Sequence, residues 1–185
     1  MPIKNSFDEK DILQELKKPS TQSAAFSKIV KQYSEPLYWH IRRMVLSHDD
    51  TNDILQNTFL KAWNNIEAFR GDSQISTWLY RIAINETLTF IAKNSNNTVS
   101  IDTPEGAVVQ QLESDVYFNG SRADALFHEA VNRLPAKQRL VFNMKYSENM
   151  KYEEISEILG TSVGALKASY HIAVNKIEEY IKKQD

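Results

Sequence analysis

Apolar side chains recur every three or four positions through most of this chain, which is the spacing of amphipathic α-helices. The segment at 37–46 is expected to continue the helix at 23–33 after a bend at Pro36, and Thr51 is expected to cap the next helix. The pattern predicts helices at residues 8–16, 23–33, 37–46, 51–64, 77–93, 123–133 and 136–146, and then a closing helical hairpin. The predicted fold class is therefore all-α.

The closing hairpin, Tyr152 to Lys167, is the most informative segment. Ile155, Ile158 and Leu159 would share one face of its first helix, with Val163 and Leu166 facing them from the second. Gly160 supplies the tight turn. This pattern is typical of a DNA-binding helix-turn-helix, although the same hairpin also occurs as a purely structural unit.

A polar, turn-rich segment interrupts the helical periodicity near the middle of the chain. It begins near Asn94 and contains Pro104 and Gly106, with one short helix expected at 108–112. Residues 96–121 carry four acidic side chains and no basic one. We therefore predict two small helical domains, 1–95 and 122–185, joined by a flexible acidic linker at 96–121.

Composition narrows the class of protein further. The chain has only 5 Gly and 5 Pro in 185 residues, which fits a mostly helical protein, and its lack of Cys excludes disulfides. No apolar run reaches the roughly 20 residues that a membrane span needs. The formal net charge of −2 argues against tight DNA binding through phosphate contacts alone. We expect a cytoplasmic protein without membrane insertion.

Residues that could perform chemistry are scattered. The four His residues, at positions 40, 48, 128 and 171, show no metal-ligand spacing, and no glycine-rich phosphate loop or nucleophile motif is present. We expect neither an enzyme nor a metal or cofactor site.

Two blocks together resemble a known family. The segment from Asp53 to Trp63, then Phe69-Arg70-Gly71, then Ser76 to Asn85, looks like region 2 of an extracytoplasmic-function (ECF) RNA polymerase sigma factor. The segment from Leu134 to Phe142, followed by the hairpin, resembles region 4 of the same family. The resemblance covers residues 23–93 and 122–182 in the expected order. It implies a region 2 helical bundle and a region 4 helix-turn-helix.

The resemblance implies a polymerase-binding face on the helix at 51–64. In the family this helix docks on the clamp helices of the largest polymerase subunit, and the flap binds region 4. Asn57 stands where the family usually has Glu, which removes one charge. The residues implied to bind polymerase are Asp53, Gln56, Asn57 and Leu60.

The resemblance also implies two promoter-binding surfaces. The chain departs from the family in lacking Arg-rich runs after Thr89 and after Lys167, which weakens its expected grip on phosphates. The residues implied to bind the −10 element are Phe69, Arg70, Ser73, Gln74, Arg81 and Asn85. For Phe69 and Trp78 taken individually, the residue type favours core packing over base binding. Those implied to bind the −35 element are Ser162, Ala165, Lys167, Ala168 and His171.

The expected function is that of a sigma factor, with core RNA polymerase, promoter DNA and an anti-sigma factor as partners. Two alternatives stay open from the residues. One is a stand-alone helix-turn-helix regulator that binds duplex DNA without polymerase. The other is a degenerate sigma-like module that sequesters an anti-sigma factor, for which the missing arginines are the best support.

Overall fold

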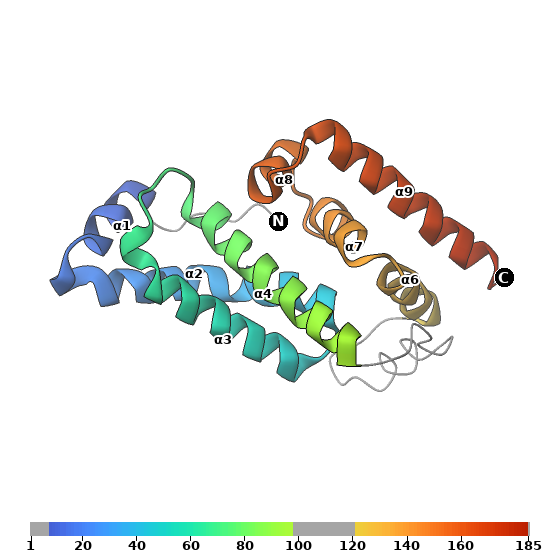
Figure 1. Ribbon diagram of the computed structural model, residues 1–185, viewed down its shortest axis with the longest axis horizontal. Helices are drawn as coiled ribbons and strands as arrows, with labels where there is room; N and C mark the ends of the chain where they lie inside the picture. Colours follow the sequence, from blue (N-terminus) through green and yellow to red (C-terminus); the bar gives the residue numbers. More distant parts are fainter. Residues whose placement is uncertain (1–7, 98–120, 185) are drawn as a thin grey trace.

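The computed structural model describes residues 8–97 and 121–184, and all of their regular structure is helical. The prediction of an all-α fold is confirmed. The helices form two groups that lie side by side (Figure 1). The first group contains α1 (Glu9–Leu16), α2 (Pro19–Val45), α3 (His48–Asn64), the short 3₁₀ helix η1 (Ile66–Ala68) and α4 (Ile75–Asn97).

Helix α2 is the longest element and passes through Pro36. The prediction that residues 37–46 continue the helix at 23–33 is therefore confirmed. Ile29, Tyr33, Leu37 and Ile41 are all buried at intervals of four, so both halves of α2 use the same face against the core. Packing along this continuous face outweighs the loss of the backbone hydrogen bond at one proline.

The start of α3 also differs from the sequence-based expectation. Leu46 adopts a left-handed conformation (φ 62°) that ends α2, and the next residue, Ser47, becomes the N-cap of α3. The Ser47 hydroxyl accepts a hydrogen bond from the Asp50 N–H at 3.3 Å. Thr51, the predicted cap, is instead buried and donates to the Ser47 carbonyl at 2.6 Å.

The second group contains α6 (Arg122–Asn132), α7 (Ala136–Phe142), the π-helical turn η2 (Asn143–Ser147), α8 (Tyr152–Leu159) and α9 (Val163–Lys182). The predicted helix at 136–146 thus changes to a π-helical turn after Phe142. Phe142 stacks on Tyr146 and on Tyr170, which joins η2 to α9. Buried Ala173 and Ile177 of α9 pack in the same small core.

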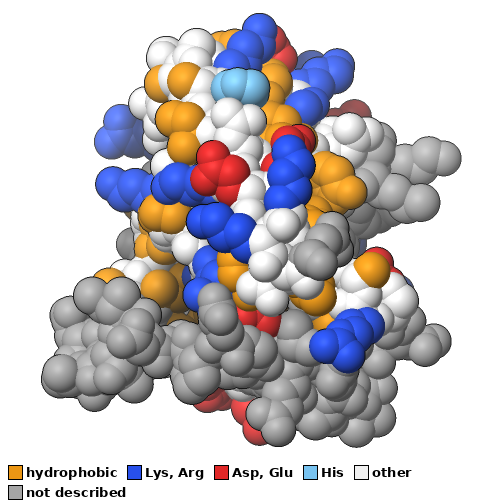
Figure 2. All heavy atoms as spheres, turned by 90° about the vertical axis from the view of Figure 1, so that its right-hand side faces the viewer, with side chains coloured by type: hydrophobic (Ala, Val, Ile, Leu, Met, Phe, Trp, Pro, Cys, Tyr) orange, Lys and Arg blue, Asp and Glu red, His pale blue; other side chains and the backbone are white. Residues whose placement is uncertain are grey.

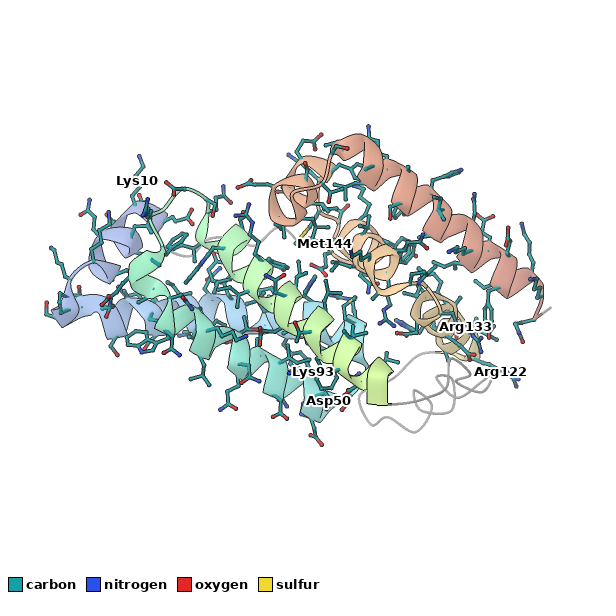
Figure 3. The ribbon with its side chains drawn as sticks, in the orientation of Figure 1. Lys10, Asp50, Lys93, Arg122, Arg133 and Met144 are labelled. Carbon is teal, nitrogen blue, oxygen red and sulfur yellow. The ribbon has the colours of Figure 1, made fainter. Side chains whose placement is uncertain are left out.

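The two groups share a continuous apolar core. Met144 of η2, labelled in Figure 3, is fully buried and belongs to one apolar cluster with residues of α2 and α4. Ile155 and Ile158 of α8 and Leu166 of α9 belong to the same buried cluster. The predicted linker, with its acidic residues and short helix, falls almost wholly at 98–120 and so lies outside the described residues.

Candidate functional site

Helix α3 exposes a face on which polar side chains lie around one apolar side chain, Leu60. Its buried side is formed by Ile54, Thr58 and Ala62, which pack on α2 and α4. The opposite side is exposed, and Leu60 keeps 53 % of its surface in contact with solvent. The four residues that the sequence assigned to polymerase binding are all exposed there: Asp53, Gln56, Asn57 and Leu60. An exposed leucine among uncharged and acidic groups suits a protein partner better than nucleic acid.

The loop between η1 and α4 holds Phe69 against the helix that follows. The Phe69 ring is half-buried and stacks on Trp78, with centroids 4.6 Å apart and planes inclined by 22°. Gly71 has a positive φ of 82°, a conformation that favours glycine. The Ile75 N–H donates to the Glu9 carboxylate, so α1 anchors the end of the loop. Phe69 therefore supports Trp78 and the loop.

The polar groups of this loop differ in exposure. Arg70 and Gln74 are exposed and Ser73 is half-buried. The Gln74 side-chain oxygen accepts a hydrogen bond from the Ser76 hydroxyl at 3.4 Å. Arg70 thus presents a charge at the mouth of the loop.

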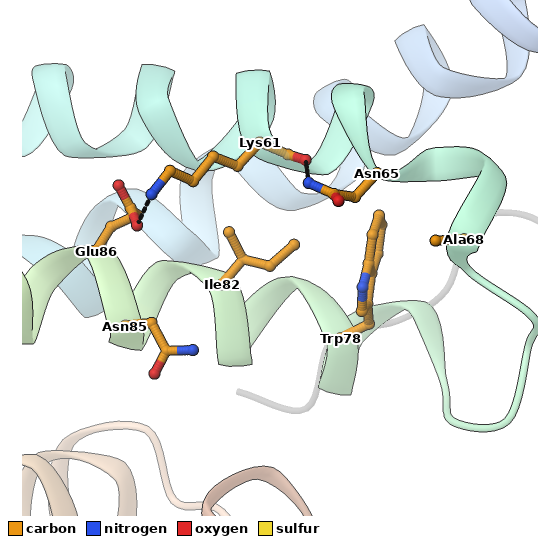
Figure 4. A pocket seen from close by; sticks show the side chains of 7 residues that line it. All are labelled: Lys61, Asn65, Ala68, Trp78, Ile82, Asn85 and Glu86. Atoms are coloured by element: carbon orange, nitrogen blue, oxygen red, sulfur yellow. Dashed lines mark hydrogen bonds and ion pairs between the residues drawn. The ribbon is translucent and has the colours of Figure 1, made fainter.

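A surface pocket of about 440 Å³ opens between α3 and α4 beside this loop (Figure 4). Trp78 and Ile82 give it apolar walls, and Lys61 pairs with Glu86 across it at 2.5 Å. The pocket is completed by Asn65, Ala68 and Asn85. Its size lies in the range of about 300–1,000 Å³ typical of small-molecule sites, and a flat ring wall beside amide groups suits a planar, hydrogen-bonding ligand such as a nucleobase.

Of the seven residues that line this pocket, the sequence assigned only Asn85 to a binding site and missed the other six. Lys61 and Glu86 are 25 residues apart and meet only because α3 packs along α4, so no local pattern reveals their pairing. Trp78 was assigned to core packing, whereas the structure leaves it half-buried with part of its surface in the pocket. The available signal was a Trp in the first turn of the helix that follows Phe69-Arg70-Gly71.

Arg81 and Asn85, which were predicted to act together, have different surroundings. Asn85 is exposed at the pocket. Arg81 instead reaches α8: its Nη2 donates to the Glu157 carbonyl at 2.6 Å and its Nε donates to the Ile158 carbonyl at 3.3 Å. Both side chains are therefore exposed, but part of the Arg81 guanidinium is already bound to α8.

The helix-turn-helix has the geometry that its sequence predicts. Gly160 is left-handed (φ 63°) and ends α8, and buried Ile155, Ile158 and Leu166 hold α8 against α9. The residues assigned to the −35 element are all exposed near the start of α9: Ser162, Ala165, Lys167, Ala168 and His171. None of these five side chains packs in the core, so all of them are accessible to a partner.

Two of these side chains already have intramolecular contacts. The Ser162 hydroxyl caps α9 by accepting the Ala165 N–H at 3.3 Å. The Lys167 ammonium lies 5.7 Å from the centroid of the Tyr152 ring, a cation–π contact. Both contacts fix the orientation of polar groups at the N-terminus of α9, where the helix dipole favours an anion.

The distribution of charge on this half of the molecule is mixed. Viewed from the end where α9 finishes, basic side chains are spread among apolar, neutral and a few acidic ones (Figure 2). Within residues 8–97 and 121–184, no group of His and acidic side chains could hold a metal ion. No described helix is long and apolar enough to cross a membrane.

Comparison with protein families matches both helix groups. The family profile described as Sigma-70 region 2 matches residues 29–97, and that described as Sigma-70, region 4 matches residues 124–177. The matches coincide with the α2–α4 bundle and with the helix-turn-helix.

Curated relatives extend the similarity over most of the chain. The ECF RNA polymerase sigma factor SigW of Bacillus subtilis is 31 % identical, over 80 % of this chain and 83 % of its own. The ECF RNA polymerase sigma-E factor of Haemophilus influenzae is 27 % identical, over 85 % of this chain and 88 % of its own.

Solved structures share the fold. CnrH, in complex with the cytosolic domain of CnrY, superposes with a TM-score of 0.68 at 20 % identity, covering 96 % of this chain and 99 % of CnrH. The sigma factor RpoE of Bartonella quintana, in complex with the anti-sigma factor NepR, gives a TM-score of 0.62 at 24 % identity, covering 85 % of this chain and 96 % of RpoE.

Proposed function

This chain belongs to the ECF group of the sigma-70 family, and from that premise we propose that it binds core RNA polymerase and directs it to specific promoters. The observation that carries the proposal is the presence of matches to region 2 and region 4, in that order, in one chain. A stand-alone regulator that binds duplex DNA by itself has no need of region 2. The protein catalyses no reaction itself and works inside the cell, where the polymerase is.

The exposed face of α3 is the polymerase-binding surface in this proposal. Leu60 supplies a central apolar contact, and Asp53, Gln56 and Asn57 supply hydrogen bonds around it. This arrangement, an apolar centre with a polar rim, is common to protein interfaces. The docked partner is the clamp of the largest polymerase subunit.

The pocket between α3 and α4 receives an unpaired base of the −10 element. Trp78 offers a ring on which the base stacks, which recovers part of the few kcal/mol that unstacking it from DNA costs. Asn85 offers its amide to the base edge, and Lys61, paired with Glu86, keeps a positive charge at the rim of the pocket. Arg70 attracts the adjacent phosphate.

The N-terminal half of α9 reads the −35 element. Lys167 and His171 are its charged or protonatable contacts, and Ala165 and Ala168 allow the helix to approach the groove closely. With so few cations, the chain depends on polymerase to hold it at the promoter. The family relationship also supports an anti-sigma factor as a regulatory partner.

The test is a reconstitution with core RNA polymerase. We expect the chain to co-elute with the enzyme and to give discrete start sites on a genomic promoter library. Asp53→Ala combined with Gln56→Ala removes two exposed polar contacts and should abolish co-elution, because interface side chains of this kind contribute about 1–3 kcal/mol each. The fold should be unaffected, since neither side chain is buried.

A matched control removes one carboxylate and one amide elsewhere. Glu179→Ala with Gln184→Ala, both exposed near the end of α9, should leave co-elution intact. DNA binding without polymerase association would contradict the proposal and indicate the stand-alone regulator. Association without transcripts from any promoter would indicate a module that only sequesters an anti-sigma factor.

A further inference from the structure

Helix α1 lies beside the loop at 69–74 that joins η1 to α4, here called the −10 loop (Figure 1). The region 2 profile matches from residue 29 onward, so α1 (Glu9–Leu16) falls wholly outside it. None of the residues assigned to polymerase or to DNA belongs to α1. The region 2 match therefore gives this helix no role, although it contacts the loop.

Two side chains of α1 contact the −10 loop and the helix that follows it. The Glu9 carboxylate accepts a hydrogen bond from the Ile75 N–H, the first amide of α4. The Leu13 side chain lies against Gly71, so that a β-carbon on that glycine would be 3.4 Å from Leu13 Cδ1. Positions 9 and 13 are four apart and share one face of α1, which makes this face the support of the loop.

Glu9 supplies a cap that the sequence next to α4 lacks. The first N–H groups of a helix have no partner within it, and a Ser, Thr, Asn or Asp just before the helix usually accepts from one of them. Gln74 precedes α4, and its side-chain oxygen accepts from the Ser76 hydroxyl at 3.4 Å. The Ile75 amide is bound instead by a carboxylate 66 residues earlier, whose charge suits the positive end of the helix dipole.

Helix α1 is itself fixed on α2. Leu16 is buried in the core, and Glu15 pairs with Lys28 of α2 at 2.8 Å. Burial, and then the charge of Glu9, raise the pKa of the buried Tyr33 of α2 to about 12, so the Glu9 carboxylate also lies near that hydroxyl. A helix held in this way is a rigid support for the loop.

The supported segment carries the groups proposed to bind the base. Trp78, in the first turn of α4, forms the flat wall of the pocket and stacks on Phe69 with ring centroids 4.6 Å apart. Arg70 directly precedes Gly71 and is exposed. A shift at the start of α4 therefore moves the Trp78 ring, and a shift at Gly71 moves the Arg70 charge.

We propose that Glu9 and Leu13 are positioning residues for −10 recognition, and that α1 holds the −10 loop and the start of α4 in the shape that receives an unpaired base. The inference rests on the proposed function, because it takes the pocket between α3 and α4 as the base site. Support from α1 favours binding because the loop need not be ordered when the base enters.

The test measures how the holoenzyme binds single-stranded −10 DNA from the promoters found in the reconstitution. Glu9→Ala should weaken this binding about tenfold, because the loop then has the required shape for only part of the time. Glu9→Gln keeps an oxygen that accepts from the Ile75 N–H, and it should bind within about threefold of the wild type. Leu13→Ala, which removes the contact with Gly71, should act in the same direction as Glu9→Ala. Co-elution with core polymerase should be unchanged in all three, since the polymerase-binding face lies on α3.

Glu15→Ala is the matched control. It removes a glutamate of the same helix, one that pairs with Lys28 rather than with the loop. Binding of the −10 strand should stay within about twofold of the wild type, because an exposed ion pair contributes little. Hydrogen exchange in the free chain adds a second measurement: amides at 69–78 should exchange faster in the Glu9→Ala chain and not in the Glu15→Ala chain.

Wild-type affinity in the Glu9→Ala holoenzyme, or an equal loss in the Glu15→Ala holoenzyme, would overturn the proposal while leaving the proposed function intact. Unchanged hydrogen exchange at 69–78 in the Glu9→Ala chain would overturn it too, because the carboxylate would then not fix the loop. A wild-type holoenzyme that binds no −10 strand would contradict the proposed function, and the role of α1 would fail with it.

Discussion

At the scale of single residues, some side chains of the proposed −10 surface also stabilise the fold, whereas others are assigned only to DNA binding. Arg81 caps α8 in the structure and is proposed to contact DNA, so its replacement changes both states at once. Asn85 lies one turn further along α4, lines the pocket and is exposed. Asn85 is therefore the cleaner probe of base recognition.

Asn85→Ala is expected to weaken binding of single-stranded −10 DNA by the holoenzyme about ten- to a hundredfold, since one base-edge contact contributes about 1–3 kcal/mol. The free energy of unfolding should change by no more than about 0.5 kcal/mol, because the side chain is exposed. Fluorescence anisotropy and urea titration measure the two quantities. Thr89→Ala, exposed on the next turn, is the control. Equal affinity for the Asn85 variant would remove the pocket from base recognition.

At the scale of elements, the N-terminus of α9 combines structure and recognition in one side chain. Ser162 caps the helix through its hydroxyl, and it also lies on the surface assigned to the −35 element. The two roles predict opposite effects of placing a carboxylate at position 162. Asp is as good a cap as Ser, but its charge repels phosphate.

Ser162→Ala should therefore cost about 0.5–2 kcal/mol of stability, and Ser162→Asp should cost nearly none. The order should reverse in promoter binding, where Ser162→Asp should lower the affinity about tenfold relative to Ser162→Ala. Thermal unfolding and footprinting of the −35 region give the two rankings. If the Asp variant protects the −35 region as well as the Ala variant does, the start of α9 does not face the DNA.

The elements also show what the sequence could predict. Short-range patterns sufficed for the all-α class and for the hairpin at Gly160, because both depend on spacing within one helix or turn. The cap at Thr51 was wrong because the left-handed Leu46 ends α2 and makes Ser47 the N-cap of α3. The pocket and the Arg81 contact join residues 25 or more positions apart, which no local pattern encodes.

At the scale of the whole molecule, the two helix groups are coupled through one buried cluster. Residues of α7, η2, α8 and α9 share it with α1–α4, so separating the groups exposes apolar surface on both. A smaller core around Phe142 and Ile177 belongs to the second group alone. The second group therefore keeps some stability of its own, and its packing against the first group adds to it.

This coupling predicts how the free chain unfolds in urea. The wild-type chain should unfold in one transition followed equally by Trp fluorescence, which reports α2–α4, and by helix content, which reports both groups. Glu148→Ala leaves His40 buried without its partner and weakens the junction, so the two signals should separate into two transitions, each with a smaller dependence on urea. Glu153→Ala should retain the single transition, because Glu153 is exposed on α8. Coincident signals in the Glu148 variant would mean that apolar contacts such as those of Met144 couple the two groups without help from the buried carboxylate.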